Sequence, residues 1–317
     1  MIQKRVVATL VEPRRFELED EQVEVGAGKV WVRVEACGIC MSEMAAYLGK
    51  GGNIYPMKLG HEATGVVEEV GENVHDLRPG DRVTSLPGPG FATHVVADPQ
   101  RLVKVPDGVE LDLALGEPLQ CGARCARSCA IEFGDHVLLI GCGFMGLLPL
   151  CGLKGNTAAE IIAVDVNPHR LSLAKELGAT IALNPKEVNV EAEVRRITEG
   201  RGVEVAIEAT GKAEPMDLAS RLLRGPRPKL VLIGYHNTPE THNFAVWGNG
   251  AVVHNPHPGY SLDPAEDLRR GLWAVQRGIF PMDRLVTHRF ALKDIGKAFE
   301  DNLNMTPGYI KGVVMLQ

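Results

Sequence analysis

The stretch from Val137 to Asp165 constrains the fold of this 317-residue chain more than any other part of it. It opens with an apolar run, Val137–Ile140, of the kind that forms a buried parallel strand. A turn that reads G-x-G-x-x-G follows at Gly141–Gly146, and a helix-compatible segment then leads to a second apolar run, Ile161–Val164. This succession predicts a dinucleotide-binding unit, because the glycines permit a tight turn, the approach of a pyrophosphate and close packing of the helix.

Asp165 ends the second apolar run and indicates which dinucleotide binds. It stands about 20 residues beyond the glycine turn, where a carboxylate accepts hydrogen bonds from the ribose hydroxyls of NAD. The same charge would repel the 2′-phosphate of NADP, so we predict NAD as the cofactor. Pro149 lies in the segment after the turn, so the helix there is expected to be short or irregular. The predicted cofactor-binding residues are Gly141, Gly143, Phe144, Met145, Gly146, Asp165, Arg170 and Gly234.

The length and the spacing of the apolar segments predict two domains. Short β segments separated by Gly and Pro turns fill residues 1–124 and predict an irregular, β-rich, barrel-like domain. Strand-like and helical runs alternate over residues 125–258, which predicts an α/β domain with a doubly wound parallel sheet. Residues 259–317 carry two helical and two strand-like segments and are expected to return to the first domain.

The composition argues against several classes of protein. The chain has 34 basic and 40 acidic residues, so we expect no basic face for nucleic acid or for an anionic membrane. No apolar run approaches the roughly 20 residues that a membrane span needs. The start of the chain shows no secretory-signal pattern, so a cytoplasmic location is expected. An odd number of cysteines, seven, favours free thiols and metal ligands over a disulfide framework.

Possible metal ligands are spread over the first predicted domain. Cys40 ends a C-x-x-C pair, which alone could also be a redox motif, half of a zinc ribbon or a packing coincidence. No second C-x-x-C follows, but His61, Glu62 and Glu117 do. Thiolate, imidazole and carboxylate all bind zinc, and a catalytic zinc keeps three protein ligands and one open position. Widely separated ligands therefore favour a catalytic zinc over a structural one.

Five segments in chain order resemble the zinc-dependent medium-chain dehydrogenases. They are Ala36–Glu43, Gly60–Gly65, Pro79–Val83, Glu117–Leu119 and the glycine turn, and together they cover nearly the whole chain. The Glu-Pro-Leu segment is similar to the sorbitol and polyol dehydrogenase branch. The resemblance implies a GroES-like catalytic domain, made of residues 1–124 and 259–317, and a Rossmann domain over residues 125–258.

The resemblance also implies roles for individual residues. Cys40 and His61 correspond to zinc ligands, and Glu62 and Glu117 to nearby carboxylates, one or the other of which binds zinc directly or through water. The alternative for Glu62 is that it holds an arginine beside the ligands. Ser42 corresponds to a residue whose hydroxyl passes the alcohol proton away from the zinc, or else it caps a helix.

Two positions depart from the family pattern. Glu43 stands where the family usually has Asp, and this puts in doubt the hydrogen bond that orients the zinc-binding histidine. A relay histidine would fall at Ala45. Proton release is therefore expected through water, through Ser42 with a cofactor hydroxyl, or through another histidine, His236 or His254. The alternatives for these two histidines are binding of substrate hydroxyls, binding of phosphate, and hydrogen bonding to loop backbone.

Other features limit the number of metal ions and suggest an assembly. Residues 84–91 bridge the place where many relatives insert a four-cysteine lobe, so we predict one catalytic zinc and no structural zinc. Cys121, Cys125 and Cys129 stand at i, i+4 and i+8, and we interpret them as packing on a buried helix. An apolar strand near Phe244–Trp247 could pair across a two-fold axis, which suggests a homodimer or homotetramer.

These features together predict a zinc-dependent oxidoreductase. It would transfer a hydride between NAD and a secondary alcohol or ketone, namely a polyol, a cyclitol or a sugar-like small molecule. Ser42, Glu62 and His236 are the predicted catalytic residues. The alternatives are an epimerase-like enzyme with tightly held NAD, a zinc-free reductase, and an inactive NAD-binding protein.

Overall fold

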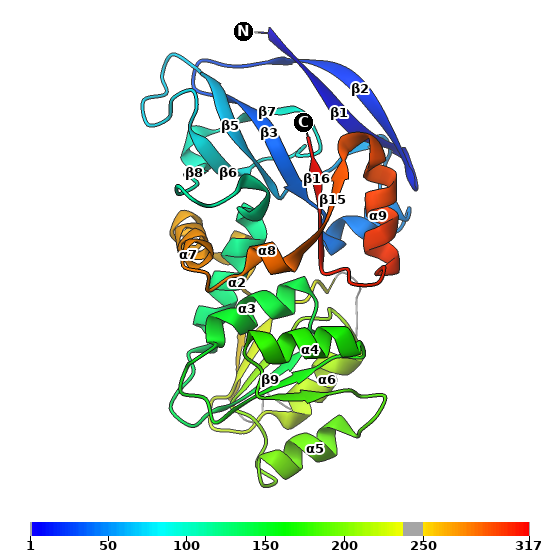
Figure 1. Cartoon of the computed structure of the whole chain (residues 1–317), viewed down its shortest axis with the longest axis vertical. Coiled ribbons are helices and arrows are strands. Elements are labelled where there is room, and N and C mark those ends of the chain that lie inside the picture. The colour runs from blue at the N-terminus through cyan, green and yellow to red at the C-terminus, as the bar shows by residue number, and fades with distance from the viewer. Residues whose placement is uncertain (1, 237–249, 317) are drawn as a thin grey trace. The chain divides into compact units, whose positions relative to one another are not determined.

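The computed structural model describes residues 2–236 and 250–316, which form two compact units (Figure 1). The first unit joins Met1–Gln120 to Leu268–Gln317, and the second is Cys121–Asp267. The predicted boundary at 124/125 and the observed one both fall inside helix α2, Gly116–Cys129. The strand predicted near Phe244–Trp247 lies outside the described residues.

The first unit is built on a seven-stranded sheet and a three-stranded sheet. The larger sheet has the order β15-β16-β3-β5-β6-β8, with β7 paired to β3. Its strands are β3 (Val30–Gly38), β5 (Ala63–Val70), β6 (Arg82–Leu86), β7 (His94–Ala97), β8 (Val103–Lys104), β15 (Val286–Ala291) and β16 (Lys311–Met315). The smaller sheet contains β1 (Ile2–Glu12), β2 (Arg15–Glu24) and β4 (Met57–Lys58).

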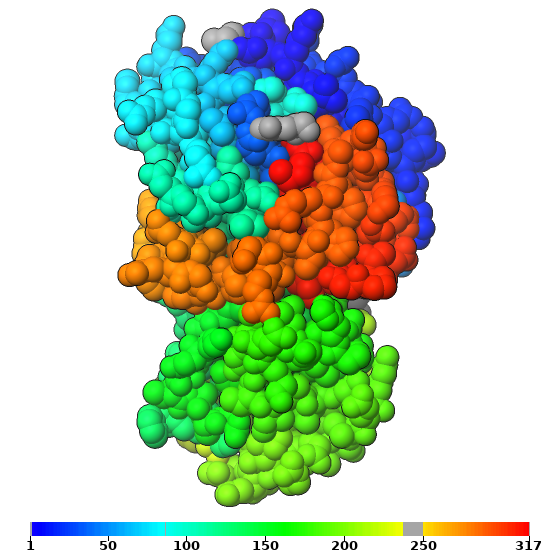
Figure 2. All heavy atoms as spheres, in the orientation of Figure 1, coloured from blue at the N-terminus to red at the C-terminus, as the bar shows by residue number. Residues whose placement is uncertain are grey.

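Both ends of the chain contribute to this first unit. Strand β16 pairs antiparallel with β3, and Val314 lies opposite Cys37. Figure 2 shows the orange and red C-terminal residues against the blue N-terminal ones. The side chains of β2 are mostly exposed and charged, so apolar alternation does not mark this strand in the sequence.

The first unit also contains helical segments and a buried aromatic cluster. Tyr47, Phe91 and Phe299 are fully buried there, and the ring of Phe299 lies 5.0 Å from that of Tyr47 and 5.6 Å from that of Phe91. The helical segments are η1 (Met41–Glu43), α1 (Met44–Tyr47), η2 (Pro99–Arg101), η3 (Leu111–Leu113), α8 (Met282–Leu285), η6 (Leu292–Asp294) and α9 (Ile295–Asn304), and α7 (Pro264–Gln276) belongs to this unit from Leu268 on.

The second unit contains the predicted doubly wound parallel sheet. Its order is β11-β10-β9-β12-β13-β14, and every pair is parallel. The strands are β9 (His136–Ile140), β10 (Glu160–Val164), β11 (Ile181–Leu183), β12 (Val205–Glu208), β13 (Lys229–Leu232) and β14 (Val252–His254). The chain leaves β9 in one direction for β10 and returns to its other side for β12. The carboxyl ends of β9 and β12 therefore flank the topological switch point, where such sheets bind ligands.

Helices accompany this sheet: α3 (Phe144–Leu153), α4 (Pro168–Leu177), α5 (Val190–Ile197) and α6 (Ala213–Leu222), with the short η5 (Pro258–Tyr260) after β14. Helix α3 has ten residues and tolerates Pro149 inside it, where the ring is buried. Asn167 caps α4, because its side chain accepts hydrogen bonds from the backbone of His169 and Arg170. Within residues 2–236 and 250–316, no helix combines the length and the apolar character that a bilayer crossing requires.

Candidate metal and dinucleotide sites

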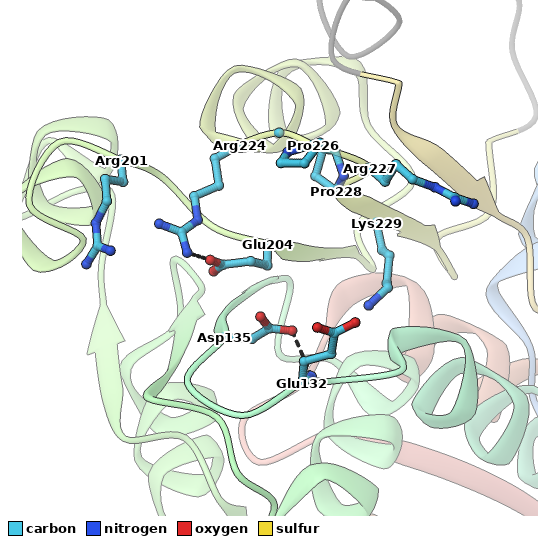
Figure 3. Close-up of a pocket in the computed structure, with 10 residues that line it drawn as sticks. Glu132, Asp135, Arg201, Glu204, Arg224, Pro226, Arg227, Pro228 and Lys229 are labelled. Atoms are coloured by element: carbon cyan, nitrogen blue, oxygen red, sulfur yellow. Dashed lines mark hydrogen bonds and ion pairs between the residues drawn. The ribbon is translucent and has the colours of Figure 1, made fainter.

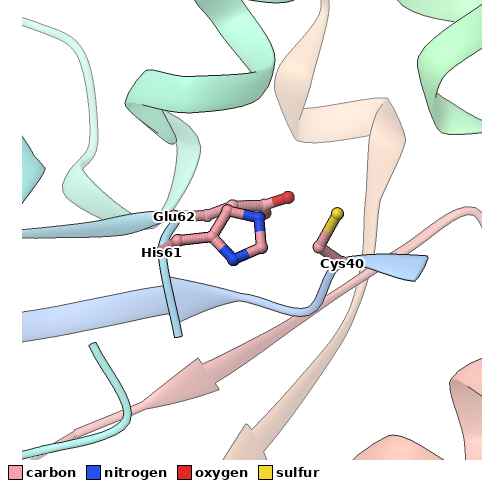
Figure 4. A group of neighbouring side chains, drawn as sticks. All are labelled: Cys40, His61 and Glu62. Carbon is pink, nitrogen blue, oxygen red and sulfur yellow. The ribbon is translucent and has the colours of Figure 1, made fainter. Parts of the chain in front are cut away.

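Three predicted metal ligands converge in the first unit (Figure 4). One ligand atom from each of Cys40, His61 and Glu62 lies within 4.8 Å of the other two. Cys40 directly precedes η1, and His61 and Glu62 directly precede β5. A thiolate, an imidazole and a carboxylate on separate segments form a donor set that fits a zinc ion.

The backbone around these residues explains their close approach. Gly60 has φ +98°, and a Cβ there would lie 2.6 Å from the backbone nitrogen of Phe91. A Cβ on Gly38 would lie 1.9 Å from Oε2 of Glu62. Glycine is therefore required at both positions, at Gly60 to turn the chain toward His61 and at Gly38 to leave room for the carboxylate.

Glu43 contacts the ring of His61, although its side chain is longer than the Asp that the family usually has there. Its Oε1 lies 3.2 Å from Nδ1 of His61 and accepts a hydrogen bond from the backbone nitrogen of Gly60 at 2.7 Å. Burial alone would lower the pKa of His61, but hydrogen bonds with Cys40 and Glu43 outweigh it and raise this pKa to about 11. A metal ion would replace the imidazole proton that faces Cys40, and Glu43 would keep the ring oriented from the Nδ1 side.

Glu62 has a lysine as its partner, so the arginine suggested by the sequence is wrong. The Nζ of Lys311 donates to Oε1 of Glu62 at 2.8 Å, lies 2.5 Å from Oε2 and donates to the carbonyl oxygen of Ile39 at 2.8 Å. Only 2% of Glu62 and 4% of Lys311 are exposed. Burial lowers the pKa of Lys311, but the charge of Glu62 and then of other nearby groups raises it above the ordinary value.

Ser42 and Glu117 lie near this group in different ways. The hydroxyl of Ser42 donates to Sγ of Cys40 at 3.2 Å. Cys40, not Ser42, is the N-cap of η1, so the helix-cap interpretation of Ser42 is wrong. Glu117 lies in the first turn of α2 and is not part of the three-atom group, although its charge contributes to the raised pKa of Lys311.

In the glycine turn of the second unit, the surroundings of each glycine explain why it has no side chain. Gly141 has φ +97°, and a Cβ there would lie 2.8 Å from Cγ2 of Thr210. A Cβ on Gly146 would lie 1.9 Å from the carbonyl oxygen of Gly141, so this glycine permits close packing of α3. The space around Gly143, the N-cap of α3, is open, as a pyrophosphate at the helix N-terminus requires.

Asp165 lies beside this turn in a fixed orientation. Its Oδ2 accepts a hydrogen bond from the backbone nitrogen of Cys142 at 2.7 Å, and its Oδ1 accepts one from that of Asn167 at 2.8 Å. Burial and then Asp165 raise the pKa of the Cys142 thiol, whereas Arg170 opposes this shift. The charges of Asp165 and Arg170 therefore both affect Cys142, which lies in the turn where the sequence predicts the dinucleotide.

Glu208 is a buried acid at the same edge that the sequence-based prediction missed. It ends β12, is 0% exposed, and its Oε2 lies 2.9 Å from Nε2 of His236. His236 thus contacts a carboxylate, and the interpretation that it only bonds loop backbone is wrong. A Cβ on Gly234 would lie 2.4 Å from Oε2 of Glu208, so packing also requires this glycine. The sequence signal that could have revealed Glu208 is an acid at the carboxyl end of a buried strand, as at Asp165.

His254 and the three cysteines of α2 lie outside the three-atom group. Burial, followed by the nearby charges of Lys229 and Arg124, lowers the pKa of His254 at the end of β14. Cys121, Cys125 and Cys129 are buried, and the metal-ligand grouping found among the described residues does not include them. Burial, followed by the neighbouring Cys129, raises the pKa of the Cys125 thiol, in agreement with packing.

A hollow of about 580 Å³ lies at the opposite, amino-terminal edge of the parallel sheet (Figure 3). In its lining, Arg224 pairs with Glu204, and Asp135 accepts a hydrogen bond from the backbone nitrogen of Glu132 at 2.8 Å. Lys229 donates to the carbonyl oxygen of Ala130 at 2.6 Å. None of the predicted site residues lines this hollow, and we assign no ligand to it.

Comparison with known proteins adds two family matches and similar full-length proteins. Residues 26–107 match the alcohol dehydrogenase GroES-like domain, and residues 145–254 match the zinc-binding dehydrogenase family. The chain is 32% identical to (R,R)-butanediol dehydrogenase of Bacillus subtilis, over 87% of this chain and 89% of that protein. It is 28% identical to erythritol/L-threitol dehydrogenase of Mycolicibacterium smegmatis, over 91% of each.

A crystal structure of an alcohol dehydrogenase zinc-binding domain protein from Burkholderia ambifaria has the same fold. Its TM-score is 0.88 at 27% sequence identity, over 100% of both chains. These matches extend over both units described above, and the relatives named here act on alcohols.

Proposed function

Because this chain belongs to the medium-chain dehydrogenase/reductase superfamily, among the zinc-type alcohol dehydrogenases, we propose that it is a zinc-dependent dehydrogenase that transfers a hydride between NAD and a secondary alcohol or ketone. The relatives support the coarser statement, an oxidoreductase acting on alcohols. The observation that carries the proposal is the convergence of Cys40, His61 and Glu62 within 4.8 Å. A diol dehydrogenase and a tetritol dehydrogenase among the relatives favour a polyol as the substrate.

The residues of the first unit would hold the metal and move the proton. Cys40, His61 and Glu62 would hold one zinc ion, with Glu43 orienting the His61 ring through its 3.2 Å contact. Bound zinc would supply Lewis-acid polarisation of the substrate oxygen, and NAD would supply the hydride acceptor. The Oγ of Ser42, 3.2 Å from Sγ of Cys40, is the group in this unit that would accept the substrate hydroxyl proton and pass it on.

The residues of the second unit would hold the cofactor. The glycine turn and the N-terminus of α3 would bind the pyrophosphate, where Phe144 and Met145 supply the first helical backbone nitrogens. Asp165 would accept hydrogen bonds from the ribose, and the positive charge of Arg170 lies near the same turn. Gly234 and His236 follow β13, at the carboxyl edge of the sheet.

The first test combines the metal content of the purified protein with an NADH fluorescence titration and NAD reduction. We expect about one zinc per chain, NADH binding, and NAD reduction with butane-2,3-diol, erythritol or sorbitol. Zinc near zero with intact NADH binding would contradict the zinc-dependent mechanism and favour a zinc-free reductase. Substrate turnover without accumulation of free NADH would instead favour the epimerase-like alternative.

A pair of glutamine variants tests which carboxylate binds the zinc. Glu62→Gln is expected to lower zinc affinity by about 100-fold or more, because Glu62 contributes an oxygen to the three-atom group. Glu117→Gln is the matched control and should lower it by about 10-fold at most, since Glu117 lies outside that group. Competition with a zinc chelator of known affinity measures both values, and the reverse order would assign the ligand to Glu117.

Asp165→Ala tests the choice of cofactor. The dissociation constant for NAD should rise by about 10- to 100-fold, because hydrogen bonds to a charged group contribute about 1.5–3 kcal/mol. The preference for NAD over NADP should fall at the same time, since the charge that opposes the 2′-phosphate is gone. Asp135→Ala, at the opposite edge of the sheet, is the control and should leave both values unchanged. An unchanged cofactor preference in Asp165→Ala would refute the ribose assignment.

A further inference from the structure

Glu208 occupies a special place in the parallel sheet of the second unit. It is the last residue of β12, lies opposite Ile140 of β9 in the strand register, and is completely buried. Strands β9 and β12 flank the topological switch point, where open parallel sheets bind their ligands beyond the carboxyl ends of the strands. A buried ionised carboxylate is costly unless donors surround it, so the partners of Glu208 indicate its role.

The two carboxylate oxygens of Glu208 have different partners. Oε1 accepts hydrogen bonds from the backbone nitrogens of Thr210 at 2.6 Å and Gly211 at 3.2 Å, and also from the Thr210 hydroxyl. Oε2 lies 2.9 Å from Nε2 of His236 and 3.2 Å from the backbone nitrogen of Gly211. An ionised carboxylate can only accept, so Nε2 of His236 must donate.

The two loops that carry these residues fit together without space for a side chain. A Cβ on Gly234 would lie 2.3 Å from the backbone nitrogen of Gly211 and 2.4 Å from Oε2 of Glu208. Gly211 has φ +67°, and a Cβ there would lie 2.5 Å from the carbonyl oxygen of Tyr235. The loop after β12 and the loop after β13 are therefore held face to face, with Glu208 as the buried link between them.

The loop held by Glu208 also contacts the glycine turn. A Cβ on Gly141 would lie 2.8 Å from Cγ2 of Thr210 and 3.1 Å from the carbonyl carbon of Ala209. Thr210 thus contacts Glu208 on one side and the turn predicted to receive the pyrophosphate on the other. The Glu208 carboxylate consequently connects the dinucleotide edge of the sheet to the His236 ring.

We propose that Glu208 is the positioning residue for His236: its carboxylate accepts the Nε2 proton, fixes the ring at the cofactor edge of the sheet, and leaves Nδ1 as the basic nitrogen. This assignment of the tautomer follows from the contacts of Glu208 alone. A carboxylate that fixes the tautomer and orientation of a histidine is a general device for preparing a base.

The catalytic consequence rests on the dehydrogenase function proposed above. In a dehydrogenase, a histidine held in this way would accept a proton on Nδ1. The resulting imidazolium is stabilised by the Glu208 carboxylate on Nε2.

The test is Glu208→Gln, which keeps the shape and changes the hydrogen-bonding roles. Oε1 faces only donors, so the amide oxygen of the glutamine must remain there to satisfy Thr210 and Gly211. The amide NH₂ group then faces Nε2 of His236 and forces this nitrogen to accept. The neutral ring must therefore move its proton to Nδ1, which reverses the tautomer.

The direct measurement is the histidine tautomer in the ¹⁵N-labelled full-length protein, by long-range ¹H–¹⁵N correlation at a pH where the ring is neutral. The His236 signals are assigned by their loss in His236→Gln. We expect the Nε2–H tautomer in the wild type and the Nδ1–H tautomer in Glu208→Gln. An Nδ1–H tautomer in the wild type would overturn the proposal without any variant, even if Glu208→Gln failed to fold.

Thr210→Val is the matched control for a purely structural role of the Glu208 network. It removes a hydroxyl hydrogen bond to Oε1 and leaves the contact between Oε2 and His236 in place. A comparable fall in the thermal midpoint is expected in both variants, with the tautomer changed only in Glu208→Gln. An unchanged tautomer in Glu208→Gln would overturn the positioning role.

The kinetic measurement separates this inference from the proposed function. With an alcohol that the wild type oxidises, Glu208→Gln should lower kcat by about 100-fold with less than about a twofold change in KM for NAD, in line with the loss of a general base. A reversed tautomer with unchanged kcat would overturn the catalytic consequence. A wild type that oxidises no alcohol would contradict the proposed function, and the tautomer measurement would still decide the role of Glu208.

Discussion

His61→Ala is expected to lower the zinc content of the purified protein from about one per chain to near zero and to lower kcat/KM by about 10³-fold or more. The metal would contribute several kcal/mol of transition-state stabilisation, and each 1.36 kcal/mol corresponds to about a factor of ten. His61 offers one of the three atoms within 4.8 Å of one another, and no other histidine among the described residues belongs to that group. NADH affinity should change less than about twofold, because the residues proposed to bind NADH belong to the second unit.

His288→Ala is the control for this experiment. His288 lies in β15 of the same unit, contacts the hydroxyl of Thr287 at 2.9 Å and is not part of the metal-ligand group. Its replacement should leave zinc content and turnover unchanged. The metal assignment would be untenable if His61→Ala retained one zinc per chain and wild-type turnover.

Lys311→Met is expected to lower the free energy of unfolding by about 3–5 kcal/mol, the cost of leaving one member of a buried ion pair without its partner. Lys311 and Glu62 are both almost completely buried, and the methionine would keep most of the side-chain volume while removing the charge. The position of the Glu62 carboxylate should also become less defined, because both of its oxygens lie within 2.8 Å of the lysine Nζ. Zinc affinity is therefore expected to fall together with stability.

Urea unfolding at matched zinc content measures this change, and two further variants interpret it. Lys297→Met removes the exposed partner of Asp301 in α9 and should cost only about 0.5 kcal/mol. The double variant Lys311→Met/Glu62→Gln should recover part of the stability lost in Lys311→Met, because it removes the uncompensated charge. Equal effects of Lys311→Met and Lys297→Met would show that the buried pair has no special role.

Much of the dinucleotide unit could be predicted because its signals are local in the sequence. The Gly141–Gly146 turn, the capping of α4 by Asn167 and the acid at the end of β10 each depend on residues a few positions apart. The doubly wound parallel sheet was also predicted, from alternating strand-like and helical runs. Strand β2 could not be recognised in the same way, because its solvated, acidic side chains hide the alternation that marks a half-buried strand.

The residues Cys40, His61 and Glu62 were predicted as possible metal ligands, but the contacts around them were not. Cys40, His61 and Glu62 are recognisable as zinc-binding types in an ordered spacing, whereas Glu117 from the same pattern lies outside the three-atom group. The compatibility of Glu43 with His61 could not be judged from the sequence. It depends on the η1 turn, which brings Oε1 of Glu43 within 3.2 Å of the imidazole.

The sequence by itself determined the glycine turn, the two fold classes and the kinds of ligand atom, because backbone freedom and donor chemistry belong to individual residues and short spacings. Only the tertiary structure decided which buried charges meet. Lys311 reaches Glu62 across 249 positions of the chain, and His236 reaches Glu208 across 28. A buried charge needs a partner, but no local pattern specifies which distant residue supplies it, because the pairing of strands within each sheet brings the two together.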